Sequence, residues 1–192
     1  MTTNLAIVGG DPWLLVSLAL VIFGSFSWAL RGHFETRGSI PNRMRLLSIF
    51  SLLSCLNYIG LLVWCNYDKP LWITVGLAGF ALSLVLFWWT VITTRRHRLK
   101  LAYTDADPDI VYTTGPYAQV RHPFYLSYII FWISSALVAG RWQWMPAVIL
   151  TSWYICIARA EEKRFRSSVL STDYDSYRAQ TGMLIPRFSG PK

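Results

Sequence analysis

The chain has 192 residues, a length that suits one domain. Hydrophobic residues make up 54% of it, charged residues only 15%, and ten residues are tryptophan. Soluble domains carry roughly 25% charged residues, so this composition excludes a disordered chain, a coiled coil and a collagen-like repeat and favours an integral membrane protein. The net charge of +8 fits either nucleic-acid binding or charge asymmetry across a bilayer, and the placement of Lys and Arg decides between them.

Five apolar stretches predict membrane-spanning helices, because a helix needs about 20 mostly apolar residues to cross the hydrocarbon core. In chain order they cover residues 12–30, 46–65, 71–94, 123–139 and 144–160. The third stretch is long enough to span with some tilt, and the fourth is short. The sequence therefore predicts an all-α integral membrane protein with five transmembrane helices, forming a single membrane domain over residues 1–192.

Lys and Arg fall almost entirely on one side of this layout. Four lie in residues 31–45, five in residues 95–122 and seven from residue 159 onward, whereas the other connections hold only Lys69 and Arg141. Cytoplasmic connections are enriched in Lys and Arg, so the N-terminus is predicted outside and the C-terminus in the cytoplasm. This asymmetry accounts for the net charge without nucleic acid.

The same layout predicts a small cytoplasmic cap, formed by the connection between the third and fourth helices and by the C-terminal segment. A chemical site in this cap would face the cytoplasm. Either a bacterial inner membrane or the endoplasmic reticulum satisfies the charge rule.

Residues 113–125 are the first stretch that could carry chemistry. Gly115 precedes a proline, which is a turn signal, and Pro123 suits the first position of a helix. Arg121 and His122 would then lie where unpaired N–H groups and the helix dipole favour a carboxylate or phosphate. The alternative is a basic interfacial loop that contacts lipid headgroups.

Residues 159–166, where the fifth helix leaves the hydrocarbon, are the second stretch. Glu162 is spaced to pair with Arg159 or with Arg166 on one helix face. Glu161 points elsewhere, because successive helix residues are about 100° apart. The alternative is a solvated, ion-paired helix end, although an unpaired carboxylate this close to hydrocarbon is costly.

The third stretch lies near the C-terminus. Tyr174 and Tyr177 share one helix face, and an apolar strip after Gly182 ends at Pro186. Such a segment either lies on the membrane surface or folds over a flat aromatic ligand. The sequence has no Ser-His-Asp, Walker A or GxGxxG motif and no metal-ligand spacing, so no metal site is expected.

Taken in this order, the three stretches resemble the isoprenylcysteine carboxyl methyltransferase family and its phospholipid N-methyltransferase relatives, which are integral membrane enzymes that use S-adenosylmethionine. The resemblance covers about residues 100–190, and the first three helices match no motif. It implies that residues 1–94 contribute three helices and that residues 95–192 form the catalytic and cofactor-binding half. The matching residues are Gly115, Tyr117, Arg121, His122, Pro123, Tyr125, Arg159, Glu161, Glu162, Tyr174, Tyr177, Ile185 and Pro186.

The resemblance implies a pocket for S-adenosylmethionine between the start of the fourth helix, the end of the fifth and the C-terminal segment. Carried over to this chain, the expected cofactor contacts are Gly115, Tyr117, Gln119, Val120, Arg121, His122, Pro123, Tyr125, Glu161, Glu162, Tyr177, Ile185 and Pro186. The expected catalytic residues are Arg159, which would orient a carboxylate acceptor, and Glu162, which would serve as the base for an amine acceptor.

The implied reaction is methyl transfer to a lipophilic or lipidated acceptor that enters from the inner leaflet. Among such reactions, the resemblance favours carboxyl methylation of an isoprenylcysteine-like substrate. Membrane lipids are expected to surround the protein. Three alternatives stay open: phospholipid or amine N-methylation, a non-enzymatic membrane scaffold, and an NADPH-dependent membrane reductase. Related reductases share the Arg-His-Pro-x-Tyr block but typically have Asn where this chain has Phe124.

Overall fold

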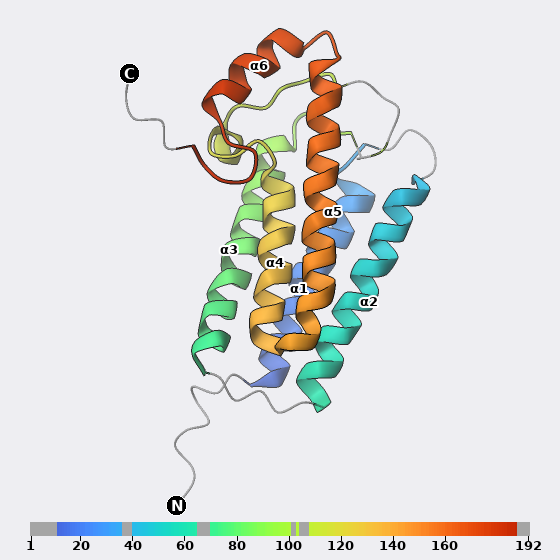
Figure 1. Cartoon of the computed structure of the whole chain (residues 1–192), viewed down its shortest axis with the longest axis vertical. Helices are drawn as coiled ribbons and strands as arrows, with labels where there is room; N and C mark the ends of the chain where they lie inside the picture. Colours follow the sequence, from blue (N-terminus) through green and yellow to red (C-terminus); the bar gives the residue numbers. More distant parts are fainter. Residues whose placement is uncertain (1–10, 36–39, 65–69, 101–102, 104–107, 188–192) are drawn as a thin grey trace, which may run out of the picture.

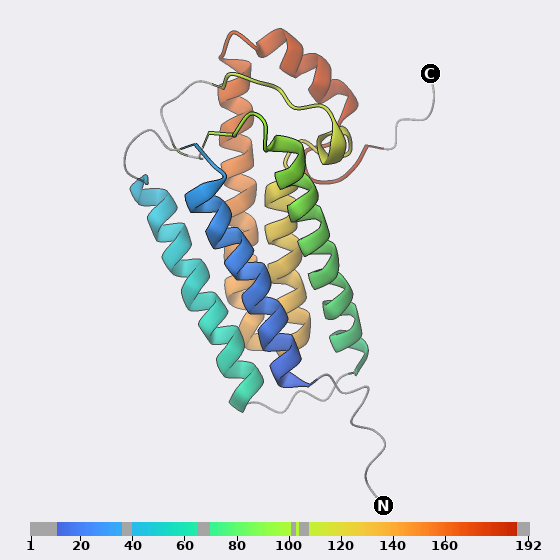
Figure 2. The ribbon, with the colours of Figure 1, turned by 180° about the vertical axis from the view of Figure 1, so that it is seen from behind.

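A computed structural model describes residues 11–35, 40–64, 70–100, 103 and 108–187, in which five long helices lie side by side and a small cap covers one end (Figures 1 and 2). The described residues contain two isolated bridges but no strand, which confirms the all-α prediction. The elements in chain order are α1 (Pro12–Gly32), α2 (Asn42–Trp64), α3 (Pro70–Thr94), the 3-10 turn η1 (Gly115–Ala118), α4 (Pro123–Ala139), α5 (Arg141–Arg166) and α6 (Ser171–Gln180).

In the part of the chain that the structure describes, three helices are long and apolar enough to cross a membrane, over residues 12–32, 42–64 and 71–94. They match the first three predicted spans, although α2 begins four residues before the predicted start. α4 has 17 residues, and α5 contains Gln143 and Pro146. Both lie where the fourth and fifth spans were predicted. That all five cross the membrane stays a prediction.

The helix bounds follow from local chemistry. Pro12 occupies the first turn of α1, where Asp11 Oδ1 accepts a hydrogen bond from the Trp13 amide at 3.0 Å. Pro123 opens α4, where the missing N–H costs nothing. Gly140 alone separates α4 from α5, at φ +82° and ψ −157°, a conformation essentially restricted to glycine. α4 and α5 therefore form a tight antiparallel hairpin.

α4 packs between α3 and α5, and small residues bring it close to α3 (Figure 1). A Cβ atom on Gly79 would overlap Ser134 Oγ, and one on Gly76 would overlap the Val138 side chain. Small side chains let membrane helices approach closely. The contact sets the start of α4 beside the end of α3.

Hydrogen bonds to the buried amide of Gln143 tie α2 to the α4–α5 hairpin. Asn57 Nδ2 donates to Gln143 Oε1 at 2.8 Å, and Gln143 Nε2 donates to the Ser54 carbonyl at 3.3 Å and to Ser135 Oγ at 3.2 Å. Gln143 is fully buried. Because an unpaired buried amide is costly, these bonds favour one register among the three helices.

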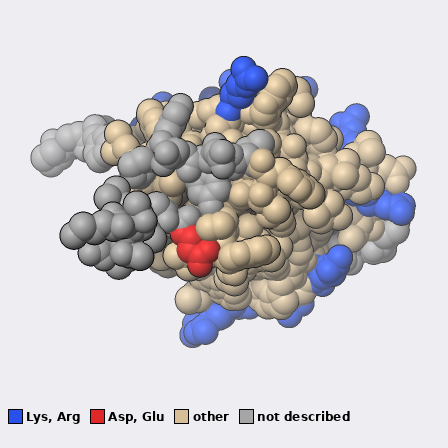
Figure 3. All heavy atoms as spheres, turned by 90° about the horizontal axis from the view of Figure 1, so that it is seen from below, with Lys and Arg blue, Asp and Glu red and all other residues tan. Residues whose placement is uncertain are grey.

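Charge is distributed unevenly between the two ends of the bundle. Among the described Lys and Arg residues, only Arg141 belongs to the end opposite the cap, and its guanidinium lies 4.9 Å from the Trp142 ring centroid. Seen from that end, the surface is mostly uncharged, with Lys and Arg toward the periphery (Figure 3). This arrangement fits the predicted orientation, which itself stays a prediction.

Candidate functional site

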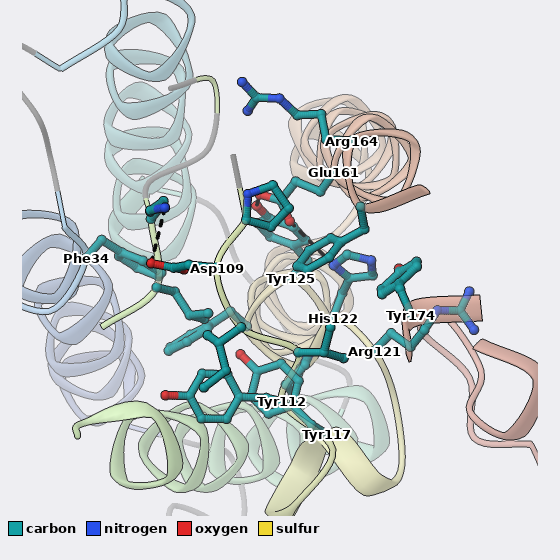
Figure 4. A pocket seen from close by; sticks show the side chains of 18 of the residues that line it. Phe34, Asp109, Tyr112, Tyr117, Arg121, His122, Tyr125, Glu161, Arg164 and Tyr174 are labelled. Carbon is teal, nitrogen blue, oxygen red and sulfur yellow. Dashed lines mark hydrogen bonds and ion pairs between the residues drawn. The ribbon is translucent and has the colours of Figure 1, made fainter. Parts of the chain in front are cut away.

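A cavity at the cap end is bounded by the residues that follow α1 and α3, the starts of α2 and α4, the end of α5, and α6 (Figure 4). Apolar side chains, tyrosines and charged groups share its walls. The tyrosines are Tyr112, Tyr117, Tyr125, Tyr128, Tyr174 and Tyr177, and the ionisable groups of other types are Lys100, Asp109, Arg121, His122, Glu161 and Arg164. The cavity therefore joins the three stretches that the sequence analysis selected.

The turn before α4 is shaped by Gly115. This residue has φ +60°, and a Cβ atom on it would lie 2.6 Å from Thr93 Oγ1 at the end of α3. Only glycine suits both the left-handed backbone and the close approach. The turn that follows buries Tyr117 in the cavity wall.

The C-terminal segment pairs with the residues just before α4. The Arg121 amide donates to the Gly182 carbonyl at 2.9 Å, and the His122 amide donates to the Met183 carbonyl at 3.1 Å. A Cβ atom on Gly182 would overlap the carbonyl oxygen of Ile185, so the tight turn over residues 182–185 requires glycine. Two segments about 60 residues apart thus form one wall beside the cavity.

Arg121 and Glu162 form a buried ion pair behind this wall. Arg121 Nε and Nη2 donate to Glu162 Oε1 at 2.8 and 2.6 Å, and Nη1 donates to the Thr181 carbonyl. Burial raises the pKa of Glu162, but hydrogen bonds from His122 and Arg121 and their charges outweigh it and lower the pKa from 4.5 to about 2. Glu162 is therefore ionised at neutral pH.

His122 lies between the two adjacent carboxylates of α5. Its Nδ1 is 3.6 Å from Glu161 Oε2, and its Nε2 is 3.4 Å from Glu162 Oε1. The ring stacks on Tyr125, with centroids 5.6 Å apart and planes 19° apart. The imidazole is thus fixed in orientation while its edge lines the cavity.

Glu161 faces the cavity. It accepts a hydrogen bond from Tyr125 Oη at 2.6 Å, and 26% of its side chain is exposed. Burial raises its pKa above the ordinary value, against the opposing effects of His122, the Tyr125 hydrogen bond and Arg164. Figure 4 shows His122, Tyr125 and Glu161 close together, with Asp109 on the far side of the cavity.

α6 closes the cavity from the cap side. Tyr174 stacks on Phe165 of α5 with centroids 4.6 Å apart, and Tyr177 Oη donates to the Tyr117 carbonyl at 2.6 Å. The two tyrosines are buried on one face of α6, which confirms the helical pattern predicted for them.

The structure brings most of the predicted residues together. Tyr117, Arg121, His122, Pro123, Tyr125, Glu161 and Tyr177 line the cavity. Gly115, Val120 and Glu162 lie outside the lining, and they support it through the turn, the chain pairing and the ion pair. Gln119, Arg159 and Ile185 are exposed, Pro186 is partly buried, and none of these four lines the cavity. What each residue binds stays a prediction.

The expected pairing on the surface of α5 is wrong. Glu162 turns inward to Arg121 instead of pairing with Arg159 or Arg166, and Arg166 Nε lies 3.8 Å from Asp175 Oδ1. Helix spacing identifies possible local partners, but it says nothing of an arginine 41 residues away that is already buried beside the helix.

One wall of the cavity was not predicted from the sequence. Leu99, Lys100 and Asp109 line it, Lys100 Nζ lies 3.2 Å from Asp109 Oδ2, and the Glu35 amide donates to the Leu99 carbonyl at 2.9 Å. A signal was present: residues 110–112 read Ile-Val-Tyr inside an otherwise polar connection.

Comparison with known proteins adds a family match. The family described as phospholipid methyltransferase matches residues 71–172, which extend from α3 into α6. Methanethiol S-methyltransferase from a Pseudomonas species is 29% identical over 155 residues, covering 72% of this chain and 58% of the relative. Methanethiol S-methyltransferase 1 from Bradyrhizobium diazoefficiens is 29% identical over 132 residues, covering 65% of this chain and 45% of the relative. The chain spans about half the length of these relatives.

Proposed function

The chain belongs to the phospholipid methyltransferase family, and from this premise we propose that it transfers a methyl group from S-adenosylmethionine to a lipophilic acceptor. One observation carries the proposal. The three motif stretches, distant in sequence, converge on one cavity in which His122 and Glu161 lie 3.6 Å apart between aromatic rings. Most of that cavity is built from the residues that match the family.

The groups that line the cavity suit this cofactor. The Glu161 carboxylate can accept hydrogen bonds from ribose hydroxyls or an ammonium group. The rings of Tyr117 and Tyr125 can contact a purine or a sulfonium cation. The His122 ring lines the cavity and is held between the two carboxylates, with Nδ1 3.6 Å from Glu161 Oε2 and Nε2 3.4 Å from Glu162 Oε1, so the ring can contact a ligand in a fixed orientation. When bound, S-adenosylmethionine supplies a methyl group on a positively charged sulfur.

The protein's own part is binding, orientation and exclusion of water. α6 covers the cavity with Tyr174 and Tyr177, and a covered site keeps water from competing with the acceptor. Tyr125 and His122 hold Glu161 in one orientation, so its carboxylate is fixed before a ligand arrives. Fixed groups of this kind reduce the entropy cost of alignment.

The first acceptor class is the isoprenylcysteine-like carboxylate that the motif resemblance implies. Arg164 lines the cavity beside Glu161 and can orient an anionic acceptor. This residue lies in the place that the sequence analysis expected Arg159 to fill. A carboxylate is already nucleophilic and needs no base.

A thiol is the second acceptor class. Three relatives carry the name methanethiol S-methyltransferase, and the raised pKa of Glu161 suits a group that takes a proton from a neutral acceptor. In this chain the acceptor-facing carboxylate would then be Glu161 and not Glu162. We further propose that the cavity faces the cytoplasm and that a lipophilic acceptor enters from the inner leaflet.

Calorimetric titration of the purified protein tests the proposal. S-adenosylhomocysteine, the product form of the cofactor, should bind with a micromolar dissociation constant, and NADPH should not bind. Glu161→Gln should weaken S-adenosylhomocysteine binding about tenfold, the loss of one charge-assisted hydrogen bond. Asp175→Asn, on the exposed face of α6, is the matched control and should bind as the wild type does.

Binding of NADPH alone would replace the proposal with the reductase alternative. Binding of neither ligand to the folded protein would favour a scaffold. If S-adenosylhomocysteine binds, turnover with a prenylcysteine analogue, a phosphatidylethanolamine vesicle and methanethiol then distinguishes the acceptor classes.

A further inference from the structure

The charged groups of Arg121 and Glu162 are occupied by protein atoms. Their side chains are 7% and 11% exposed, and two guanidinium nitrogens of Arg121 donate to one oxygen of Glu162. The third nitrogen donates to the Thr181 carbonyl and, at 3.4 Å, to the Arg178 carbonyl. Arg178 Nε lies 3.8 Å from the other oxygen of Glu162. Little of either side chain is left for a ligand.

The same pair joins three elements. Arg121 stands at the start of α4, Glu162 is near the end of α5, and Thr181 follows α6. The backbone amides of Arg121 and His122 pair with the Gly182 and Met183 carbonyls in the same place. Because His122 is the next residue, its position depends on how firmly this junction is held.

We infer that Arg121 and Glu162 are positioning residues: their ion pair locks the C-terminal segment against the start of α4, fixes His122, and leaves ligand contact on this side of the cavity to His122 and Glu161. The inference rests on the proposed function where it concerns a ligand. It departs from the expectation that Arg121 and Glu162 hold the cofactor and that Glu162 is a base.

Removal of one partner distinguishes a lock from a ligand contact. Glu162→Gln leaves the buried Arg121 charge without its counterion, and Arg121→Gln leaves the buried Glu162 carboxylate with only one arginine contact, the longer one to Arg178 at 3.8 Å. Each single change is therefore destabilising. The double variant R121Q/E162Q leaves no charge, and its two amides can still hydrogen-bond to each other and to the Thr181 carbonyl. If the ion pair acts only by positioning its neighbours, the double variant should regain the Tm and the ligand affinity that each single variant loses.

Three measurements are made on each full-length variant: the apparent Tm without ligand, the Kd for S-adenosylhomocysteine, and hydrogen–deuterium exchange of the amides of Arg121 and His122. Arg166→Gln is the matched control, because its ion pair with Asp175 also joins α5 to α6 but is more than half exposed. Exposed pairs contribute little.

We expect each single variant to lower the apparent Tm by roughly 10 °C. Each should also speed exchange at the two amides and weaken binding about tenfold, as loss of groups that orient a binding residue does. The double variant should bind within about threefold of the wild type, with most of the Tm restored, and Arg166→Gln should change nothing.

Two results would overturn the inference. The first is a double variant with a restored Tm that binds as weakly as the single variants, because the pair would then contact the ligand. The second is single variants with unchanged exchange and Tm. If the double variant does not fold, Gly182→Ala loosens the same junction without altering either charge, and unchanged binding and exchange in it would also refute the lock. If the wild type does not bind S-adenosylhomocysteine, only the proposed function is refuted. The apparent Tm and the amide exchange rates of the variants still test whether the ion pair holds the junction.

Discussion

Gly115 offers a quantitative test of how the cavity wall is built. Gly115→Ala should lower the free energy of unfolding for two reasons. The left-handed backbone costs about 1–3 kcal/mol for a residue with a Cβ atom. The Cβ atom would also lie 2.6 Å from Thr93 Oγ1, and this crowding adds about 1–3 kcal/mol. We expect a total near 4 kcal/mol, or a fall in apparent Tm of roughly 12 °C. Thermal unfolding of the purified protein, followed by tryptophan fluorescence, measures it.

Two matched variants separate the penalties. Gly140 also has a positive φ, but a Cβ atom there meets nothing within 4 Å, so Gly140→Ala should lose only the backbone part, about 2 kcal/mol. Thr93→Ala removes the obstructing oxygen, and the double variant G115A/T93A should match Gly140→Ala. If the double variant is no more stable than Gly115→Ala, or if Gly115→Ala costs no more than Gly140→Ala, the steric reasoning is wrong.

Three further predictions follow from the packing and from the pKa of Glu162. The folded-state pKa of Glu162 is about 2, below its ordinary 4.5, so the stability that the ionised carboxylate gives the fold is present above pH 4.5 and is lost as the pH falls toward 2. Thermal melts from pH 6 to pH 2.5 should show this loss, and Glu162→Gln should reduce the dependence of the Tm on pH. Gly79→Ala should lower the Tm because its Cβ would overlap Ser134, whereas Gly24→Ala, with open space around it, should leave the Tm unchanged or raise it. Gln143→Leu should lower the Tm by several degrees in the same assay, because Asn57 and two other groups lose a buried partner, and an unchanged Tm would show that these hydrogen bonds do not stabilise the bundle.

The fold was predictable because its signals are local. Apolar length identifies each long helix, Pro123 marks the start of α4, and the short connection at Gly140 predicts a hairpin. The start of α2 was placed too late because Arg43 and Arg45 interrupt the apolar run, although charged residues at a membrane interface are compatible with a helix.

The candidate site was only partly predictable. The motif resemblance assigned His122 and Glu161 to one pocket, formed by the start of the fourth helix and the end of the fifth. The partner of Glu162 could not be found this way, because Arg121 is 41 residues distant and only tertiary packing brings the two together. The motifs also do not predict which of their residues are buried. Ile185 matches one motif, yet it is 78% exposed.

The pairing of residues 182–183 with the chain before α4 has a consequence for biosynthesis. All five long helices precede this segment in the chain, so they can emerge from the ribosome and begin to pack before the residues that precede α4 have their C-terminal partner. A nascent chain arrested before Thr181 would hold all five of these helices, yet the amides of Arg121 and His122 would lack the Gly182 and Met183 carbonyls, and the Arg121 guanidinium would lack the Thr181 carbonyl. The backbone that precedes α4 therefore gains its C-terminal hydrogen bonds only after synthesis has passed the last of the five long helices.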